Sequence, residues 1–244
     1  MIAAAERRLG PLTVRASTCE AMVKDIVAAV REHRAMRVAF ANTHLLYCAA
    51  RDPGLARELK AFCIVNDGVG VDLLSRIATG ERFPENLNGT DLTPRVLDAL
   101  PDGSRIFLLG ATPDVAVAAA RRIAERWPGL LVCGVRDGYA GLAEAIEEVA
   151  RASPDLVLVA MGNPLQERLI ADCSRRRESV FIGVGALFDF IAGAAPRAPA
   201  AWRRLRLEWL FRLLREPKRL WRRYTIEVLV LAALICRERF MRRA

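Results

Sequence analysis

The sequence predicts an open, mainly parallel α/β sheet with helices on both faces, Rossmann-like, followed by a basic helical appendage. Six short and almost continuously apolar runs alternate with longer helix-like segments, which is the pattern of parallel strands covered on both faces. Positive charge is concentrated at the end of the chain: residues 197–244 hold 14 Arg/Lys and 4 Glu, whereas residues 1–196 hold 23 Arg/Lys and 24 Asp/Glu. These observations divide the chain into an α/β domain (1–196) and a basic amphipathic appendage (197–244).

The strands of the α/β domain alternate with helix-like segments. The predicted strands are Arg37–Ala41, Phe62–Asn66, Arg105–Gly110, Leu130–Val135, Asp155–Met161 and Val180–Val184. The predicted helices are Cys19–Glu32, Leu45–Lys60, Val71–Ala78, Leu92–Leu100, Pro113–Trp127, Leu142–Ala152 and Pro164–Arg176. Such alternation implies right-handed strand–helix–strand units, which bring the carboxyl ends of the strands to one edge of the sheet.

The appendage is predicted to contain two helical segments, Trp202–Arg215 and Lys218–Met241, with Pro217 breaking or kinking the chain between them. Three of the four tryptophans lie here. Arginine with tryptophan suits a surface that meets phosphates at an apolar–water boundary, and it also suits a solvated basic face with a few packed aromatics. The apolar stretch Val228–Cys236 is too short to span a bilayer, so we expect it to pack on the body or on a second copy of the chain rather than in a membrane interface.

Composition excludes several classes of protein. The longest charge-free run, Val38–Ala50, has 13 residues, and Met1–Gly10 carries charges where a signal peptide needs an apolar stretch, so neither a spanning helix nor export is expected. The six cysteines are dispersed without a C-x-x-C pair, and there are only two histidines. We therefore expect a reduced, cytoplasmic protein without a metal centre.

Polar residues and glycines recur where the predicted strands end. Ligand sites in open α/β sheets form beyond these carboxyl ends, and glycines and helix N-termini there favour a bound diphosphate. The turns concerned are Asn42-Thr43-His44, Asp67-Gly68, Gly110, Gly138-Tyr139, Gly162-Asn163 and Gly185 with Asp189. Ordinary capping explains many of these residues singly, but together they favour a nucleotide-type ligand. No Asp-x-Asp pair occurs, so arginines and helix ends would have to neutralise a diphosphate.

Asp67 is the most distinctive carboxylate of this edge. It follows an apolar strand directly and precedes Gly68, so a partly desolvated position is expected. Such a group accepts a proton from an attacking hydroxyl, and the competing interpretation is an aspartate that caps the next helix. From the residues alone, the cap is the favoured interpretation.

Several short motifs occur in a fixed order along the chain. The motifs are Asn66-Asp67-Gly68-Val69-Gly70-Val71, Asn88-Gly89-Thr90-Asp91, Phe107-Leu108-Leu109-Gly110, Gly162-Asn163-Pro164-Leu165-Gln166-Glu167, Gly183-Val184-Gly185-Ala186-Leu187-Phe188-Asp189-Phe190, and Arg197-Ala198-Pro199 with Leu207-Glu208-Trp209-Leu210 and Arg215-Glu216-Pro217-Lys218-Arg219. This ordered series resembles the WecG/TagA/CpsF glycosyltransferase family of bacterial surface-polysaccharide synthesis. The resemblance covers roughly Arg37 to Tyr224, and the ordered set is more specific than any one motif.

The resemblance implies an inverting, metal-independent transfer of an N-acetylmannosamine-type or uronic sugar from a UDP-sugar to a polyprenyl-diphosphate-linked saccharide, with no cofactor and no nucleic acid. It makes Asp67 the general base and overturns the capping interpretation. It assigns substrate contacts to Asn42, Thr43, His44, Asn88, Asp91, Gln166, Arg212, Arg219 and Arg222. It assigns nucleotide contacts to Gly110, Gly138, Tyr139, Gly162, Asn163, Gly185 and Asp189.

By the same resemblance the appendage closes over the site and docks on the anionic inner face of the bacterial plasma membrane. The chain departs from the family pattern at Phe40, where many relatives have threonine, and at Asn86, where many have arginine. Thr43 or His44 is a candidate replacement for the missing hydroxyl, and the change at Asn86 leaves the donor contacts open.

Two other classes of protein stay open at this point. One is an NAD(P)-dependent oxidoreductase of the same fold class. The motif Gly183-Val184-Gly185 argues against it, because the glycine fingerprint of dinucleotide-binding proteins is incomplete there. The other is a non-enzymatic adaptor that binds a membrane or a nucleic acid through its basic tail. A homo-oligomer through Val228–Cys236 is a further possibility.

Overall fold

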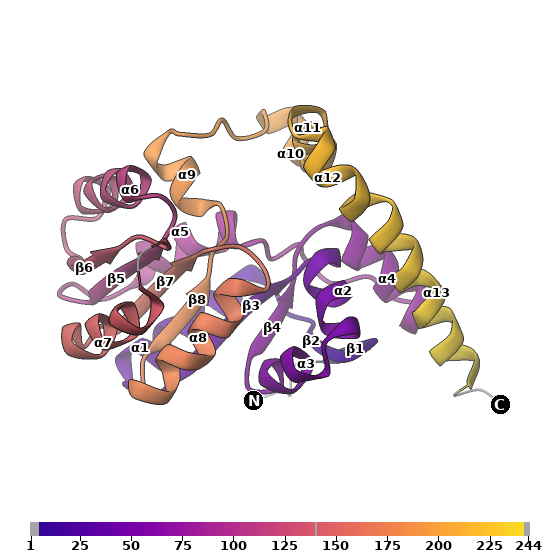
Figure 1. The fold of residues 1–244 in the computed structure, drawn as a ribbon, viewed down its shortest axis with the longest axis horizontal. Helices are drawn as coiled ribbons and strands as arrows, with labels where there is room; N and C mark the ends of the chain where they lie inside the picture. Colours follow the sequence, from indigo (N-terminus) through magenta and orange to yellow (C-terminus); the bar gives the residue numbers. More distant parts are fainter. Residues whose placement is uncertain (1–4, 140, 242–244) are drawn as a thin grey trace.

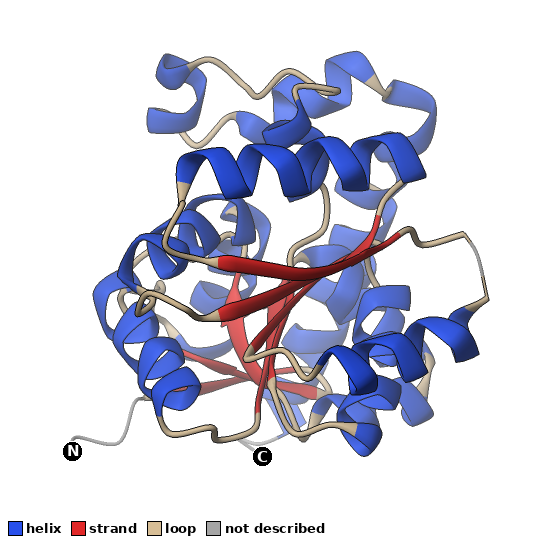
Figure 2. Cartoon of the chain, turned by 90° about the vertical axis from the view of Figure 1, so that its left-hand side faces the viewer, coloured by secondary structure: helices blue, strands red, loops and turns tan. Residues whose placement is uncertain are grey.

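A computed structural model describes residues 5–139 and 141–241 of the chain. Eight strands form one sheet in the order β1-β2-β4-β3-β8-β7-β5-β6. All neighbouring strands are parallel except β1 and β2, which form an antiparallel pair at one edge. Figure 2 shows the twisted sheet lying between helices on both sides. The predicted α/β fold class is therefore confirmed.

The strands are β1 (Glu6–Leu9), β2 (Leu12–Arg15), β3 (Met36–Ala41), β4 (Cys63–Asn66), β5 (Arg105–Gly110), β6 (Leu131–Arg136), β7 (Leu156–Ala160) and β8 (Val180–Gly183). The helices of the body are α1 (Cys19–Arg31), α2 (Thr43–Arg51), α3 (Pro53–Leu59), α4 (Val69–Thr79), α5 (Gly89–Ala99), α6 (Pro113–Arg126), α7 (Leu142–Ala152), α8 (Leu165–Arg176) and α9 (Leu187–Ala192). Four more helices follow: α10 (Ala200–Arg204), α11 (Glu208–Arg215), α12 (Pro217–Tyr224) and α13 (Ile226–Met241).

Two hydrophobic cores lie on the two faces of the sheet, because alternate residues of each strand point to opposite sides. In β3, Ala39 and Ala41 belong to the core under α2, α3, α4, α7, α8 and α13. Val38 and Phe40 of the same strand belong to the core under α1, α5, α6 and α9. The strands buried on both faces are the continuously apolar runs of the sequence, and all six predicted strands are present within two residues of their expected bounds.

The N-terminal hairpin of β1 and β2 was not predicted. Its strands have four residues each and alternate buried with exposed side chains, so charged residues such as Glu6 and Arg8 interrupt the apolar pattern. Gly10 adopts a φ of +58° in the turn between them. The hairpin is stable because β2 extends the sheet beside β4 and covers the edge of the core with Leu9 and Leu12, which only the tertiary fold supplies.

The predicted helix Leu45–Lys60 is two helices. The carboxylate of Asp52 accepts hydrogen bonds from the backbone N–H groups of Gly54 and Leu55, and Pro53 occupies the first position of α3. Proline cannot donate a backbone hydrogen bond within a helix but fits its first turn, so the chain ends α2 and begins α3 at this point.

The appendage also has more helices than predicted, four instead of two. Pro217 begins α12, as expected of a residue that breaks the preceding helix, and a second break at Thr225 separates α12 from α13. Figure 1 shows this segment rising from α9, crossing above the body as α10 to α12, and descending beside α4 as α13. Among the helices that the structure describes, none has the length and apolar character needed to cross a bilayer.

Helix α13 packs on the body through one face. Leu231 and Ile235 are 2% and 3% exposed and join the core beside α2 and α4, which confirms the expectation that Val228–Cys236 packs there. Leu229 on the opposite face is 70% exposed. A guanidinium N–H of Arg239 donates to the carbonyl of Ile77 near the end of α4, so the C-terminal end of α13 is tied to the body.

Candidate active site

Asp67 lies at the carboxyl edge of the sheet, immediately after β4. Its backbone N–H donates to the carbonyl of Ala41, the last residue of β3, at 2.8 Å. Gly68 follows with a φ of +90°, which favours glycine and turns the chain into α4. No hydrogen bond joins the carboxyl group of Asp67 to another of the described residues, so the geometry does not support a helix cap and leaves the carboxylate available to a ligand.

Burial raises the pKa of Asp67 to about 6, because the surrounding protein atoms disfavour the charged form. The guanidinium of Arg212 lowers this pKa, whereas the carboxylates of Glu208 and Asp91 raise it. Arg212 and Glu208 both belong to α11, so the appendage contributes charges to the surroundings of Asp67. A carboxyl group with a pKa near 6 is mostly ionised at neutral pH and is more basic than an ordinary aspartate, which suits a general base.

The loop before α5 holds the backbone on both sides of Asp67. The side-chain amide of Asn66, which is fully buried, donates to the carbonyl of Glu85 at 2.8 Å, and the N–H of Leu87 donates to the carbonyl of Asn66 at 3.1 Å. The side-chain oxygen of Asn86 accepts from the N–H of Gly68 at 2.6 Å. Asn86 thus holds the backbone of Gly68, the residue that precedes α4 and follows Asp67, which gives this departure from the family pattern a definite structural role.

A network of amide side chains joins the carboxyl ends of β3, β7 and β8. The amide NH₂ of Asn42 donates to the side-chain oxygen of Asn163 at 2.8 Å. Oε1 of Glu167 accepts from Asn163 at 2.6 Å and from Gln166 at 2.8 Å. The side-chain oxygen of Gln166 in turn accepts from two backbone N–H groups, those of Gly162 and Gly185. Five residues predicted from three separate motifs therefore meet in one hydrogen-bonded group around Glu167.

Asn88 and Asp91 form the capping turn of α5. The side-chain oxygen of Asn88 accepts from the backbone N–H of Asp91 at 2.9 Å, and its NH₂ donates to the carboxylate of Asp91 at 2.8 Å. Arg197 donates to the other oxygen of this carboxylate at 2.6 Å. Asp91 therefore acts on Asp67 through its charge while its own carboxylate connects α5 to the start of the appendage.

Thr43 and His44 face away from the amide network. Thr43 is 7% exposed, and its methyl group lies so close to Gly70 that a Cβ at that glycine would approach it to 2.6 Å. Nδ1 of His44 lies 2.9 Å from a carboxylate oxygen of Glu227 in α13. The structure thus turns His44 toward the appendage, and Phe40 is packed in the core against Gly89.

The predicted nucleotide contacts occupy neighbouring turns. Gly110 has a φ of +120°, and a Cβ there would lie 2.4 Å from the carbonyl oxygen of Ala160, so only glycine fits between β5 and β7. Gly138 packs against Gly110 and donates its N–H to the carbonyl of Ala111. Tyr139 is 80% exposed. Asp189 lies half-buried in the first turn of α9.

The three predicted appendage arginines lie in different surroundings. Arg212 is half-buried and acts electrostatically on Asp67, whereas Arg222 in α12 is exposed. The side chain of Arg219 lies outside the described residues. Arg206, which was not predicted, donates to the buried carboxylate of Asp72 in α4 at 2.7 Å and so holds the turn before α11 near the site.

Besides Arg206, two further charged residues of this region were missed, Glu167 and Glu208. Glu167 belongs to the motif Gly162–Glu167, but an acidic residue in the first turn of a helix is ordinarily explained by the helix dipole. Its side chain is only 1% exposed, and this burial depends on the fold. Glu208 lies one helical turn before Arg212, and this spacing in the sequence indicates that the two charges lie on the same face of a helix.

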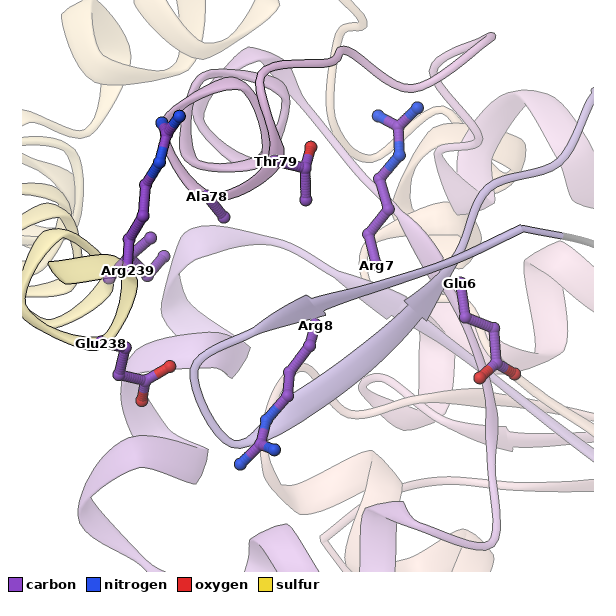
Figure 3. Close-up of a pocket in the computed structure, with 8 residues that line it drawn as sticks. Glu6, Arg7, Arg8, Ala78, Thr79, Glu238 and Arg239 are labelled. Carbon is purple, nitrogen blue, oxygen red and sulfur yellow. The ribbon is translucent and has the colours of Figure 1, made fainter. Parts of the chain in front are cut away.

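A pocket of about 280 Å³ opens far from Asp67, between β1, α4 and α13 (Figure 3). It is lined by Glu6, Arg7, Arg8, Ala78, Thr79, Ile235, Glu238 and Arg239. Helix α4 begins beside Asp67 and ends at this pocket, so its 11 residues separate the two places by roughly 16 Å. The guanidinium of Arg7 already donates hydrogen bonds to the side chains of Ser75 and Glu81. We assign this pocket no part in the active site.

Comparison with known proteins connects this geometry to one family. The family model described as "Glycosyl transferase WecG/TagA/CpsF family" matches residues 7–244. The N-acetylglucosaminyldiphosphoundecaprenol N-acetyl-beta-D-mannosaminyltransferase of Bacillus subtilis is 35% identical over 186 residues, covering 75% of this chain and 72% of that protein. The enzyme of the same name from Bacillus spizizenii is 34% identical over 187 residues, with the same coverage of both chains.

Proposed function

The chain belongs to the WecG/TagA/CpsF glycosyltransferase family, and from this premise we propose that it transfers an N-acetylmannosamine-type or uronic sugar from UDP to a polyprenyl-diphosphate-linked saccharide. The observation that carries the proposal is the position of the Asp67 carboxylate at the carboxyl edge of the sheet. Among the described residues it has no hydrogen-bond partner, and the charge of Arg212 acts on it. The names of the two relatives support the lipid-linked acceptor.

In the proposed reaction Asp67 removes the proton of the acceptor hydroxyl as its oxygen attacks the anomeric carbon of the donor. Attack comes from the face opposite UDP, the bond from the anomeric carbon to the UDP oxygen breaks, and the configuration inverts. The bonding electrons leave with UDP, so negative charge grows on the diphosphate. Among the described residues, Arg212 is a cation whose charge acts on Asp67. A cation that is already in place before the reaction stabilises the growing negative charge most at the transition state.

We further propose that the reaction needs no metal ion. The sequence contains no Asp-x-Asp pair for a metal-bound diphosphate, so arginines and helix N-termini would take this role. Gly110, Gly162 and Gly185 have positive φ values in turns at this edge of the sheet, where the absence of a side chain lets a diphosphate approach the backbone closely. Retention of full activity in excess chelator is the expected result.

The appendage is proposed to dock on the anionic inner face of the plasma membrane. It carries basic side chains together with exposed apolar ones, which is the composition of a surface held by both burial and electrostatic attraction. The exposed apolar residues are Leu205, Leu214, Trp221, Ile226, Leu229, Val230, Phe240 and Met241. Trp202 and Trp209, by contrast, pack edge-to-face on Phe211 and Tyr224. A homo-oligomer through Val228–Cys236 stays a prediction, which sedimentation analysis would test.

Family membership favours a glycosyltransferase over the oxidoreductase and the adaptor. The discriminating experiment offers several UDP-sugars with a short-chain polyprenyl-diphosphate saccharide, with and without chelator, and follows UDP release and the linkage formed. We expect turnover of one donor with inversion and no effect of chelator. Tight NADH binding without any effect of UDP would instead support an oxidoreductase, and undiminished biological function of Asp67→Ala would support an adaptor.

A further inference from the structure

Glu167 is a buried carboxyl group for which the proposed reaction has no direct use. It lies in the first turn of α8 with 1% of its surface exposed, behind Gln166, which is 2% exposed. Burial raises its pKa to about 6, while the hydrogen bonds from Gln166 and Asn163 lower it. Its second oxygen, Oε2, is buried and has no hydrogen-bond partner among the described atoms. An incompletely paired buried acid is costly, so its presence beside a binding site calls for an explanation.

The chemistry of a carboxylate explains the orientation of its neighbours. An ionised carboxylate accepts hydrogen bonds and donates none, so both amides that meet Oε1 must present their NH₂ groups to it. The oxygen of Asn163 then faces away from Glu167 and accepts from the NH₂ of Asn42 at 2.8 Å. The oxygen of Asn42 in turn accepts from the N–H of Leu45 and caps α2. One acceptor thereby sets the direction of a chain of three side chains.

Gln166 is oriented in the same way. Because its NH₂ meets Glu167, its oxygen accepts from the N–H of Gly162 at 3.2 Å and from the N–H of Gly185 at 3.0 Å. Both glycines have positive φ values, +72° and +57°, and lie in the turns after β7 and β8. A reversed amide would place its NH₂ against these two N–H donors, so the orientation of Gln166 also holds the backbone of both turns.

We propose that Glu167 is a positioning residue that orients the amides of Gln166, Asn163 and Asn42, and so decides where the sugar pocket donates and where it accepts hydrogen bonds. The inference rests on the proposed function, because it assumes that Asn42 and Gln166 contact the sugar. It extends that function by naming the group that gives the pocket its polarity. A sugar that presents the wrong pattern of hydroxyl and acetamido groups would meet unpaired buried groups, which is a strong source of selectivity.

The decisive variant is Glu167→Met, which keeps the length of the side chain and removes both carboxylate acceptors. We expect kcat/KM for the donor sugar to fall by about tenfold to a hundredfold, since small displacements of positioning groups have effects of this size. Glu178→Met, the same change at an exposed glutamate, should leave kinetics unchanged. Asn163→Ala and the double variant complete a cycle, and the effect of Glu167→Met should shrink in the Asn163→Ala background. Additive effects, or a fully active Glu167→Met enzyme, would overturn the inference.

A measurement without substrate separates this inference from the proposed function. In the wild-type protein, the side-chain amide resonances of Asn163 and Gln166 should titrate together as Glu167 takes up a proton, with Cys48 as the other titratable group that interacts with Glu167. The same resonances should shift in Glu167→Met and keep their positions in Glu178→Met. Absence of any UDP-sugar turnover in the wild type would refute the proposed function alone. Amide resonances of the wild type that do not change as Glu167 titrates would refute its positioning role, whether or not the Glu167→Met variant folds.

Discussion

Replacing Asp67 by asparagine should remove activity and at the same time stabilise the fold at alkaline pH. The pKa of Asp67 is raised from 3.8 to about 6, so the folded protein binds this proton more tightly than the unfolded chain does. The ionised carboxylate therefore costs stability above pH 6, and the cost disappears below the unfolded pKa. A shift of roughly 2 units corresponds to about 3 kcal/mol at pH 8 and about 1 kcal/mol at pH 4.5. Asparagine carries no charge and should recover up to this amount.

The assay is urea unfolding followed by circular dichroism at both pH values, with free energies from linear extrapolation. Turnover of Asp67→Asn with the lipid-linked acceptor should fall by about 10² to 10⁴, the usual contribution of a general base. Asp102→Asn, at an exposed aspartate, serves as the control. Two results would refute the reasoning: a variant less stable than the wild type at pH 8, or a gain in stability that is the same at pH 8 and pH 4.5.

Three further predictions test the appendage. Arg212→Met should raise the pKa of Asp67 and move the acid limb of the pH–rate profile to higher pH, and Glu208→Gln should move it to lower pH; equal or reversed shifts would contradict the charge arrangement. Glu227→Gln should weaken the contact with His44, seen as faster hydrogen exchange in α13 and not in α7. Serine at the exposed residues Trp221, Leu229 and Phe240 should reduce sedimentation with anionic liposomes. The reduction should grow at high salt, because salt screens the electrostatic attraction and leaves the apolar contacts to hold the protein. Val117→Ser on α6 should have no such effect, and an equal loss in both variants would argue against docking.

The elements that the sequence predicted are those whose burial is uniform. Strands such as Arg105–Gly110 are apolar and buried from their second residue onward because both faces are covered, and this pattern does not depend on which strand lies beside which. The hairpin Glu6–Arg15 was not predicted because each of its strands is half exposed. The hairpin is stabilised by the pairing of β2 with β4, which is distant in the sequence. The break of the expected helix at Pro53 follows from a local rule, and the sequence contained the signal for it.

The candidate site divides in the same way. Asp67 could be located because it follows an apolar strand and precedes a glycine, so strand polarity alone brings it to the carboxyl edge. His44 could not be placed, because its ring meets Glu227, a residue 183 positions later in the chain. The buried position of Glu167 and the orientation of the amides around it likewise depend on three strand ends that meet only in the folded sheet.

By itself the sequence determined the alternation of strands and helices, the edge of the sheet where polar turns collect, and the concentration of positive charge in the last residues, because these features depend on local pattern and composition. Only the tertiary structure decided that α11 brings the charges of Arg212 and Glu208 to Asp67, that α13 is held by Leu231, Ile235 and Arg239, and that one buried carboxylate accepts hydrogen bonds from two amide side chains at the strand ends. The physical reason is that electrostatic effects and burial act between residues that are close in space, and packing brings these residues together from distant parts of the chain.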